Sequence, residues 1–463
     1  MNAIQNQDIS AKPAQQQETR GFFAGRDIAS LVQSQASGTL TAADIVYHAS
    51  AAIARLDPVL NAFAHVDFDA ALAVAHELDA ERAQGRLRGP LHGIPIAIKD
   101  LIDVIGMPTT MGAAHFLGHY PAADAQCVAR PRAAGAIIIG KTVTHEFAYG
   151  STGDRSVQGP VRNPWRTTRM TGDSSAGSGA AVAAGMVPAA LGTDTGGSVR
   201  IPAALCGVVG FKPTHGLVSV EGVFPLSPSL DDVGALAGNV PDCALLMQVM
   251  AGLDGSAAPS ATVRALWVDN APFAIDDPAV TACVHKYAER LPGAMCNGAV
   301  VPAKASALQN AIAVIQKSEA YATHAELIEQ APQEYGPEVL KRLRASAEVK
   351  GWELVRAWHM RERLQQDFAD LFTEIDVLAM PTVAITAPAL QQRRIDGPDG
   401  AHVSVSGTLL GLTNPWNVLG LPAISLPAGF VNGLPVGLQL VAAAGKDSML
   451  LALAARLPAI RPE

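Results

Sequence analysis

The stretch "TGDSSAGSGAAVAAGMVPAALGTDTGGSVR", residues 171–200, constrains the fold of this chain more than any other segment. It contains four serines and many small residues, as a flexible linker would. A linker usually has polar flanks, whereas this stretch encloses the apolar run "GAAVAAGMVPAAL". Such a run favours a packed helix beside tight turns, where glycine permits positive φ and close backbone approach. The stretch therefore predicts an ordered site.

The segment "TDTGGS", residues 193–198, is suited to binding an anion with its backbone. Consecutive N–H groups can point into one small space there, as the oxyanion of an acyl transfer requires. A serine nucleophile also needs a base. Lys99 ends the apolar run "GIPIAIK", and burial would favour its neutral, basic form. The alternative is that Lys99 reaches solvent or pairs with Asp100.

Composition excludes several classes of protein. Of the 463 residues, 49% are hydrophobic and 16% are charged, so the chain can bury a large core. The net charge of −8 disfavours nucleic-acid and anionic membrane partners. Five cysteines lie far apart without a C-x-x-C motif, which favours a reducing compartment over a disulfide framework or zinc site. We expect a cytoplasmic protein.

The ends of the chain differ from its middle. Residues 1–20 are polar and glutamine-rich without the apolar segment of a secretory signal, and we expect a disordered leader there. Residues 21–463 are predicted to form a single domain. Residues 403–445 lack charged side chains, but prolines and glycines interrupt them. Short buried strands and turns explain this segment better than a membrane span.

Hydrophobic patterns predict alternating helices and strands, and hence an α/β sheet. Helices are expected at residues 41–56, which begin with a T-x-x-D capping box, and at 67–84. Alternating isoleucines predict a strand at 93–100. Further strands are expected in the segments 133–142, 199–216 and 414–441, the first following a helix end and the other two mixed with loops.

Residues 255–372 hold most of the long charged helical pattern. We expect helices over one side of the sheet. They either form a wall of a substrate pocket or simply pack on the sheet.

Three short motifs resemble other kinds of site. "GAIIIGKT", residues 135–142, has P-loop spacing, but its isoleucines favour a buried strand. "GDSSA", residues 172–176, resembles a nucleophile elbow, yet no HGGG-type stretch precedes it, so an α/β-hydrolase-type esterase is only an alternative. His145 and Glu146 begin a zinc-helix motif in which Tyr149 occupies the second histidine position. No metal site is predicted.

Several linked motifs resemble the amidase signature family. They are "GIPIAIKDLIDVIGMPTTMG", "GAIIIGKTVTHEFAYG", "SSAGSGAAVAAG", "GTDTGGSVRIPAALCGVVGFKPTHG" and "GLPAISLPAG…GLPVGLQLV". The similarity runs from about residue 41 to the C-terminus and is weakest between 255 and 372. It implies an α/β fold with a mixed central β-sheet covered by helices on both faces.

The resemblance also implies a Ser–cis-Ser–Lys triad without a metal or organic cofactor. Ser198 would be the nucleophile, Ser174 the bridging serine and Lys99 the base. The oxyanion hole would come from the backbone N–H groups of Thr195, Gly196, Gly197 and Ser198.

Other residues near these motifs have weaker assignments. Asp194 and Arg200 flank the nucleophile and either pair to brace the oxyanion loop or bind unrelated partners. Tyr149, Gly150 and Ser151 are expected to line the substrate pocket by resemblance, as are Thr152 and residues 226–231, although loop packing would also explain them. Ser175 and Ser178 are expected at a helix entry or in packing.

This chain departs from the "PGGSSGGS" sequence that is common in the family. Thr171 replaces proline, and Asp173 and Ala176 replace glycines. The cis peptide of the family would here join Asp173 to Ser174. A carboxylate beside the triad could alter the protonation of Lys99.

The predicted function is a serine amidohydrolase that cleaves amides, or anilides, esters or carbamates, of small molecules through an acyl-enzyme on Ser198. One alternative is the glutamine-hydrolysing subunit of a tRNA-dependent amidotransferase, and another is a non-catalytic binding protein on the same fold. The expected partner is a small-molecule amide, with no nucleic acid or membrane, and the expected state is a monomer or homodimer.

Overall fold

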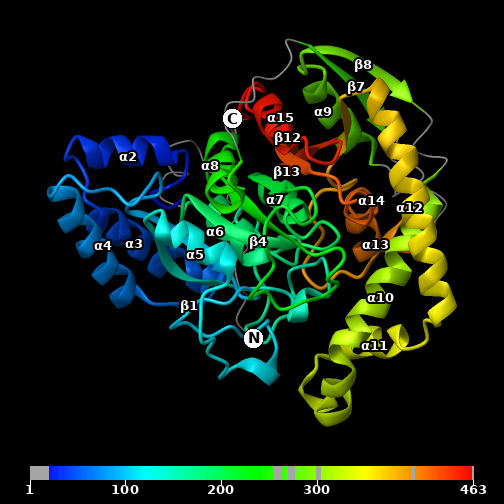
Figure 1. The fold of residues 1–463 in the computed structure, drawn as a ribbon, viewed down its shortest axis with the longest axis horizontal. Coiled ribbons are helices and arrows are strands. Elements are labelled where there is room, and N and C mark those ends of the chain that lie inside the picture. The colour runs from blue at the N-terminus through cyan, green and yellow to red at the C-terminus, as the bar shows by residue number, and fades with distance from the viewer. Residues whose placement is uncertain (1–19, 254–261, 269–276, 299–303, 398–401, 461–463) are drawn as a thin grey trace, which may run out of the picture.

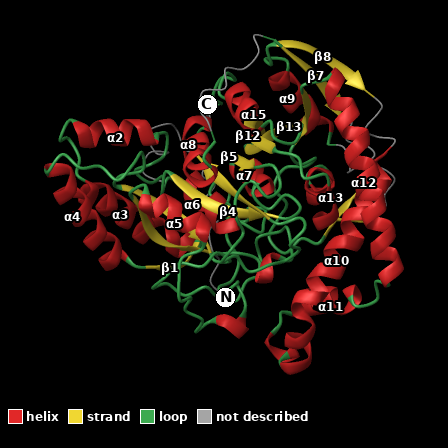
Figure 2. Ribbon diagram, viewed as in Figure 1, coloured by secondary structure: helices red, strands yellow, loops and turns green. Residues whose placement is uncertain are grey.

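A computed structural model describes residues 20–253, 262–268, 277–298, 304–397 and 402–460 (Figure 1). The predicted leader therefore lies almost wholly outside the described residues. Figure 2 shows strands through the middle of the molecule with helices around them. Helices cover both faces of the sheet, as the sequence predicts.

Among the described residues, eleven strands form one mixed sheet in the order β1-β3-β2-β4-β6-β5-β12-β13-β9-β7-β8. In chain order these strands are β1 (Phe63–Val66), β2 (Ile94–Lys99), β3 (Ala136–Thr142), β4 (Ala189–Asp194), β5 (Val209–Lys212), β6 (Asp232–Ala237), β7 (Val263–Val268), β8 (Gly293–Gly298), β9 (Val377–Pro381), β12 (Ala423–Val431) and β13 (Leu434–Ala442). A separate antiparallel pair consists of β10 (Arg394–Asp396) and β11 (His402–Ser404).

Strands β3, β2 and β4 are parallel neighbours. All residues of these three strands are buried, which explains why they are almost continuous apolar runs. Their carboxyl ends meet at one edge of the sheet, where α/β proteins commonly bind ligands. The segments that follow these ends are therefore placed side by side.

The helices of the described residues are α2 (Ile28–Ala36), α3 (Ala42–Leu60), α4 (Phe68–Ala83), α5 (Gln126–Ala133), α6 (Ala176–Ala183), α7 (Arg200–Cys206), α8 (Val240–Ala251), α9 (Pro278–Ala288), α10 (Ala305–Gln330), α11 (Pro337–Ser346), α12 (Gly351–Glu374), α13 (Val405–Gly411), α14 (Asn414–Val418) and α15 (Asp447–Ala454). Short 3₁₀ turns lie at Ala114–Phe116, Glu146–Ala148 and Pro332–Glu334.

Alternation along β7 separates two hydrophobic cores. Ala265 and Trp267 belong to the larger core, which includes residues of α3, α8, α9 and α15. Leu266 and Val268 belong to a second core with residues of α10, α12 and α14. Successive side chains of a strand point to opposite faces, so these helix groups cover opposite faces of the sheet at this end.

The predicted helix starts are confirmed. Thr41 and Asp44 form a reciprocal capping box at the start of α3, where each side chain accepts a hydrogen bond from the other residue's backbone N–H. Asp67 accepts from Ala70 N at the start of α4. Such caps satisfy the free N–H groups of a first helical turn, which explains why these ends are readable from local sequence.

Two segments predicted as strands and loops also contain helices. Residues 199–216 form α7 before β5, and residues 414–441 form α14 before β12 and β13. Pro415 lies in the first turn of α14. A proline is tolerated there because its missing N–H would have no partner in the helix. Interpreting the prolines of this segment only as interruptions was therefore incomplete.

Residues 255–372 are not purely helical. β7 and β8 from this region extend the main sheet beyond β9, as parallel neighbours. The charged pattern at 337–372 is also divided between α11 and α12. The apolar run "VRALWV" of β7 is short enough to be read as either a strand or a buried helical segment, and only pairing with β9 decides.

None of the described helices is long and apolar enough to cross a membrane. All five cysteines lie in the described residues and are free, with Cys127, Cys206 and Cys243 buried. The structure thus contains no disulfide among them.

Candidate active site

Lys99 is the last residue of β2, and its side chain is completely buried. Its Nζ atom lies 2.6 Å from Ser174 Oγ and 2.6 Å from Thr193 Oγ1. Asp100, the alternative partner, instead lies 3.1 Å from Lys141 Nζ. Asp100 is the first residue after the strand, and its carboxylate is also bonded to Thr110 N. Lys99 therefore neither reaches solvent nor pairs with Asp100.

Burial lowers the pKa of Lys99 from 10.5 to about 7, because desolvation disfavours the ammonium. Asp173, Asp194 and Asp231 oppose this effect by favouring the positive charge. Near neutral pH, both the neutral amine and the ammonium are accordingly accessible. A base that acts at neutral pH needs this property.

Ser174 precedes α6, and the peptide bond between Asp173 and Ser174 is cis. Thr144 Oγ1 donates to the Ser174 carbonyl oxygen at 2.9 Å, which holds the backbone of this turn. Thr193, the second contact of the Lys99 amine, is a residue to which the sequence motifs gave no role. Its position near the end of β4, two residues before Thr195, the first residue of the predicted oxyanion hole, was the available signal.

Ser198 lies on the loop between β4 and α7. Its carbonyl oxygen accepts from Ser175 N at 3.1 Å, which brings the loop of Ser198 against the turn of Ser174. Ser198 keeps 5% of its surface exposed, whereas Ser174 and Lys99 have none. Within the described residues no hydrogen bond joins the hydroxyls of Ser174 and Ser198. The structure thus shows the Lys99–Ser174 contact directly and places the Ser198 backbone against the turn of Ser174.

The Asp194 carboxylate organises the predicted oxyanion loop. It accepts from Gly197 N at 2.7 Å and from Val199 N at 3.1 Å. Gly197 has φ of 135°, and a Cβ there would collide with Thr413 Oγ1, so glycine is required. In the described part of the chain, three loop N–H groups have no hydrogen-bond partner, namely those of Thr195, Gly196 and Ser198. These are the N–H groups available to an oxyanion, because Gly197 N is occupied by Asp194.

Asp194 and Arg200 form a buried ion pair, with Arg200 Nη2 2.8 Å from Asp194 Oδ1 and Nε 3.0 Å from Oδ2. Burial alone would raise the pKa of Asp194, but the Arg200 charge and its hydrogen bonds lower it overall. Both side chains are fully buried. The predicted pairing is present, and its bidentate geometry matches the strongest kind of ion pair.

Residues after position 410 complete this network. No role was predicted for them from the sequence, although Gln439 lies within the motif "GLPVGLQLV". Asn417 Nδ2 donates to Asp194 Oδ1 at 2.9 Å, and Arg200 Nη1 donates to Gln439 Oε1 at 2.7 Å. Thr413 Oγ1 donates to the carbonyl oxygen of Gly196 at 2.6 Å. The polar residues in the otherwise apolar segment 403–445 were the available signal, since buried polar groups need partners.

The segment Tyr149–Ser151 lies against helices of the C-terminal half. Tyr149 Oη lies 3.2 Å from Ser346 Oγ of α11, and Ser151 Oγ lies 2.9 Å from Ser406 Oγ of α13. The Ser151 carbonyl oxygen accepts from Asp173 N at 3.0 Å. The segment thus adjoins the turn of Ser174, but its polar side chains already have partners.

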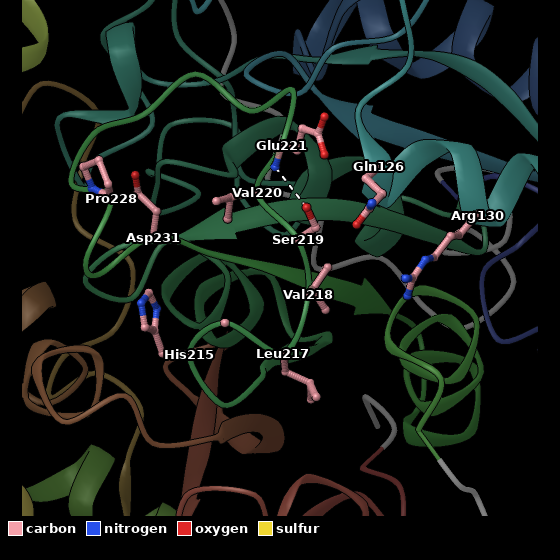
Figure 3. A pocket seen from close by; sticks show the side chains of 11 residues that line it. Gln126, Arg130, His215, Leu217, Val218, Ser219, Val220, Glu221, Pro228 and Asp231 are labelled. Atoms are coloured by element: carbon pink, nitrogen blue, oxygen red, sulfur yellow. Dashed lines mark hydrogen bonds between the residues drawn. The ribbon is translucent and has the colours of Figure 1, made fainter.

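A cavity of about 480 Å³ lies beside the loop of residues 215–221 (Figure 3). Asp231 lies on its wall and accepts from Thr195 Oγ1 of the oxyanion loop at 2.6 Å. Asp231 is the residue of the predicted segment 226–231 that connects this cavity to the candidate site. Lys99, Ser174 and Ser198 do not line this cavity.

The other motifs have structural roles. Residues 136–142 of the P-loop-like stretch form the buried strand β3, as predicted, and Lys141 donates to Pro108 O and Thr109 Oγ1. Ser175 Oγ donates to Thr193 O, and Ser178 Oγ donates to Leu191 O, so both serines join α6 to β4. His145 Nδ1 lies 3.0 Å from Asp173 Oδ2, and His145 precedes a short 3₁₀ turn and not a zinc-binding α-helix. In the part of the chain that the structure describes, no cluster of side chains is arranged to hold a metal ion.

Comparison with known proteins identifies the family of this chain. The sequence model of the amidase family matches residues 44–274 and 277–451. A glutamyl-tRNA(Gln) amidotransferase subunit from Chloroflexus aurantiacus is 39% identical, with 90% of this chain and 92% of that relative covered.

Two solved structures show the same fold. A crystal structure of an amidase has a TM-score of 0.86 and 33% identity, covering 93% of this chain and 99% of the other. The peptide amidase of Stenotrophomonas maltophilia has a TM-score of 0.79 and 30% identity, covering 95% and 99%. This chain therefore belongs to the amidase signature family.

Proposed function

We propose that this protein is a serine amidohydrolase that cleaves amide bonds of small molecules, with anilides, esters or carbamates as further substrates. The observation that carries the proposal is the 2.6 Å contact of a fully buried Lys99 amine with Ser174 Oγ. A neutral amine there can accept a proton from Ser174, which in turn can accept one from Ser198.

In the proposed reaction, Ser198 Oγ attacks the substrate carbonyl carbon and loses its proton to Lys99 through Ser174. The N–H groups of Thr195, Gly196 and Ser198 stabilise the oxyanion. The same relay returns the proton to the leaving amine. Water then attacks the acyl-enzyme, and Ser198 regains its proton. Asp194 and Arg200 hold the oxyanion loop through the bonds to Gly197 and Val199.

The names of similar structures support hydrolysis by a stand-alone enzyme. One is described as an amidase and another as a peptide amidase. A third, at 27% identity and a TM-score of 0.81, is a 6-aminohexanoate cyclic dimer hydrolase. We propose a cytoplasmic location. We also propose a monomeric or homodimeric state, and size-exclusion chromatography with light scattering would test this oligomeric state.

A second candidate function is glutamine hydrolysis within a tRNA-dependent amidotransferase. The 39% identity to the Chloroflexus amidotransferase subunit, over 90% of this chain, favours it. In that case the acyl-enzyme would be a glutamyl ester on Ser198, and ammonia would pass to a partner protein. The chemistry at Ser198 would be the same, so substrate and partner dependence distinguish the two functions.

The test is intact-mass spectrometry of the purified chain with a panel of amides, anilides, esters, carbamates and glutamine. We expect an acyl adduct on Ser198 and turnover of simple amides without partner proteins. Ser198→Ala should abolish both, whereas Ser178→Ala should retain the adduct, because the Ser178 hydroxyl contacts Leu191 O and Thr142 Oγ1 and not the proposed reacting groups. An adduct with glutamine alone, and turnover only with partner proteins, would favour the second function. Absence of any adduct on Ser198 would reject both.

A further inference from the structure

His145 and Asp173 form a buried pair beside the candidate triad, and the proposed mechanism does not yet use it. His145 Nδ1 lies 3.0 Å from Asp173 Oδ2, and each side chain is 1% exposed. Asp173 Oδ1 accepts from Ala176 N at 3.1 Å. The Asp173 carboxylate therefore has a backbone N–H at one oxygen and the His145 ring at the other.

The segment after β3 holds the turn of Ser174 through three bonds. Gly177 N donates to Val143 O at 3.0 Å, and Thr144 Oγ1 donates to Ser174 O at 2.9 Å. The contact of His145 with Asp173 is the third. Thr142, just before this segment, pairs with Lys99 across β3 and β2. The histidine is therefore fixed to the strand that neighbours the Lys99 strand.

Asp173 differs from the other carboxylates that act on the Lys99 amine, which are Asp194 and Asp231. Asp194 is neutralised by Arg200 at 2.8 Å, and Lys212 also acts on it. Asp231 accepts from Thr195 Oγ1 and from two backbone N–H groups. Among the described residues, the Asp173 carboxylate has only the Ala176 N–H and the His145 ring as partners. In this part of the chain His145 is therefore the one side-chain partner of the Asp173 carboxylate.

We propose that Asp173 and His145 are a positioning pair for the Lys99 base, in which the carboxylate favours the ammonium form and the imidazole N–H offsets part of that charge. This inference rests on the proposed function, because it assigns the pair to the charge balance of the proton relay. Asp173 occupies a position where the family commonly has glycine.

Packing fixes the orientation of the imidazole. His145 Nε2 is buried without a hydrogen-bond partner among the described residues. Gly150 lies against the ring, and a Cβ at that position would collide with it. The ring therefore cannot turn its other nitrogen to Asp173 without leaving that space. Gly150, predicted as a substrate-binding residue, here acts by holding His145.

The test measures the pH dependence of covalent labelling of Ser198 by phenylmethanesulfonyl fluoride, read by intact mass, so no substrate need be known. Asp173→Asn preserves the shape and removes the charge. We expect its labelling midpoint to fall by about half to one pH unit, because Lys99 loses a group that favours its ammonium. His145→Ala should raise the midpoint, since the carboxylate loses its N–H donor, and His145→Asn should restore it partly.

The double variant Asp173→Asn/His145→Ala should have the midpoint of Asp173→Asn alone, because His145 acts only through Asp173. An unchanged midpoint in Asp173→Asn, or a shift of the same sign in His145→Ala, would overturn the inference. If wild-type Ser198 is not labelled at any pH, the proposed function fails instead. Circular dichroism checks the fold of each variant, and Asp173→Asn decides the question if His145→Ala does not fold.

Discussion

Burial of the Lys99 amine destabilises its charged form in the folded protein, while the proposed chemistry needs the neutral amine that burial favours. A lysine normally keeps its amine in water, but here the end of β2 places it among buried strands. Its pKa of about 7 means that, between pH 7 and pH 10.5, the unfolded chain holds a proton that the folded protein does not. Raising the pH through this window therefore stabilises the folded state.

Lys99→Met tests the direction in which pH changes the stability of the folded state. We expect the free energy of unfolding of the wild type, relative to Lys99→Met, to increase by about 2–3 kcal/mol between pH 7 and pH 9. Urea unfolding at pH 6, 7 and 9 measures it. Below pH 7 both states of the wild type carry the proton, so the difference should be constant there. A difference that does not change between pH 7 and pH 9 would show that Lys99 is not held as a neutral amine.

Asp194→Asn tests whether the Asp194 carboxylate stabilises the oxyanion loop. The substitution leaves Arg200 buried without its counter-charge, so we expect a loss of about 3–5 kcal/mol in the free energy of unfolding. Labelling of Ser198 should slow as well, since Gly197 and Val199 lose a charged acceptor. The control is Asp376→Asn, whose ion pair with Arg264 is largely exposed and should contribute at most about 1 kcal/mol. Equal effects of the two substitutions would contradict a special role for Asp194.

At the scale of elements, the start of α11 is attached to the loop that follows Tyr149. Glu338 of α11 lies 3.1 Å from Arg155 and 3.1 Å from Arg393. Arg393 also bonds Asp154, which is buried. Arg342 of the same helix donates to the Tyr149 carbonyl oxygen. α11, from the region 255–372, thus has polar contacts with the segment 149–155, part of which was predicted to line the substrate pocket.

Glu338→Gln should loosen this contact without altering the triad. Because the ion pairs are about one-third exposed, we expect a loss of only about 0.5–1 kcal/mol in stability. The larger effect should be a raised KM with little change in kcat, since the helix positions the Tyr149 loop and not Ser198. Steady-state kinetics with the best amide of the panel measures this. Asp367→Asn, which removes a partly exposed ion pair with Lys304, is the matched control and should change neither constant.

At the scale of the whole molecule, one sheet connects the two halves of the chain. β7 and β8 come from the region that resembles the family least, yet they continue the sheet beyond β9. α10, α12 and α14 then pack in one core over that end of the sheet (Figure 1). The region is thus built into the main fold and is not attached to its surface.

We expect a single cooperative unfolding transition as a consequence. Tryptophan fluorescence and far-ultraviolet circular dichroism should give the same midpoint in urea, because Trp267 of β7 and Trp416 of α14 lie in cores on the two faces of one sheet. An early transition seen by fluorescence alone would contradict the predicted single domain of residues 21–463. Adding a stabilising salt such as ammonium sulfate should raise both midpoints together.

Much of this protein could be predicted from local sequence. Helix caps such as Thr41 and Asp67, the buried run of β2 and the glycines of the oxyanion loop each depend on contacts within a few residues, and those signals are visible in the sequence. The positions of Lys99, Ser174 and Ser198 were assigned by their motifs alone. The helix α14 was missed because its first-turn proline was taken as an interruption.

Tertiary structure alone decided which distant groups meet. Thr193 beside Lys99, Asn417 on Asp194 and His145 on Asp173 are separated by 94, 223 and 28 residues along the chain. No local sequence pattern specifies such pairs of residues. They depend on which strands are neighbours in the sheet and on which strand ends lie at the same edge. The sequence by itself determined the chemical groups available for the proposed acyl transfer. The parallel arrangement of β3, β2 and β4 determined their surroundings, because it collects three strand ends in one place that water largely cannot reach.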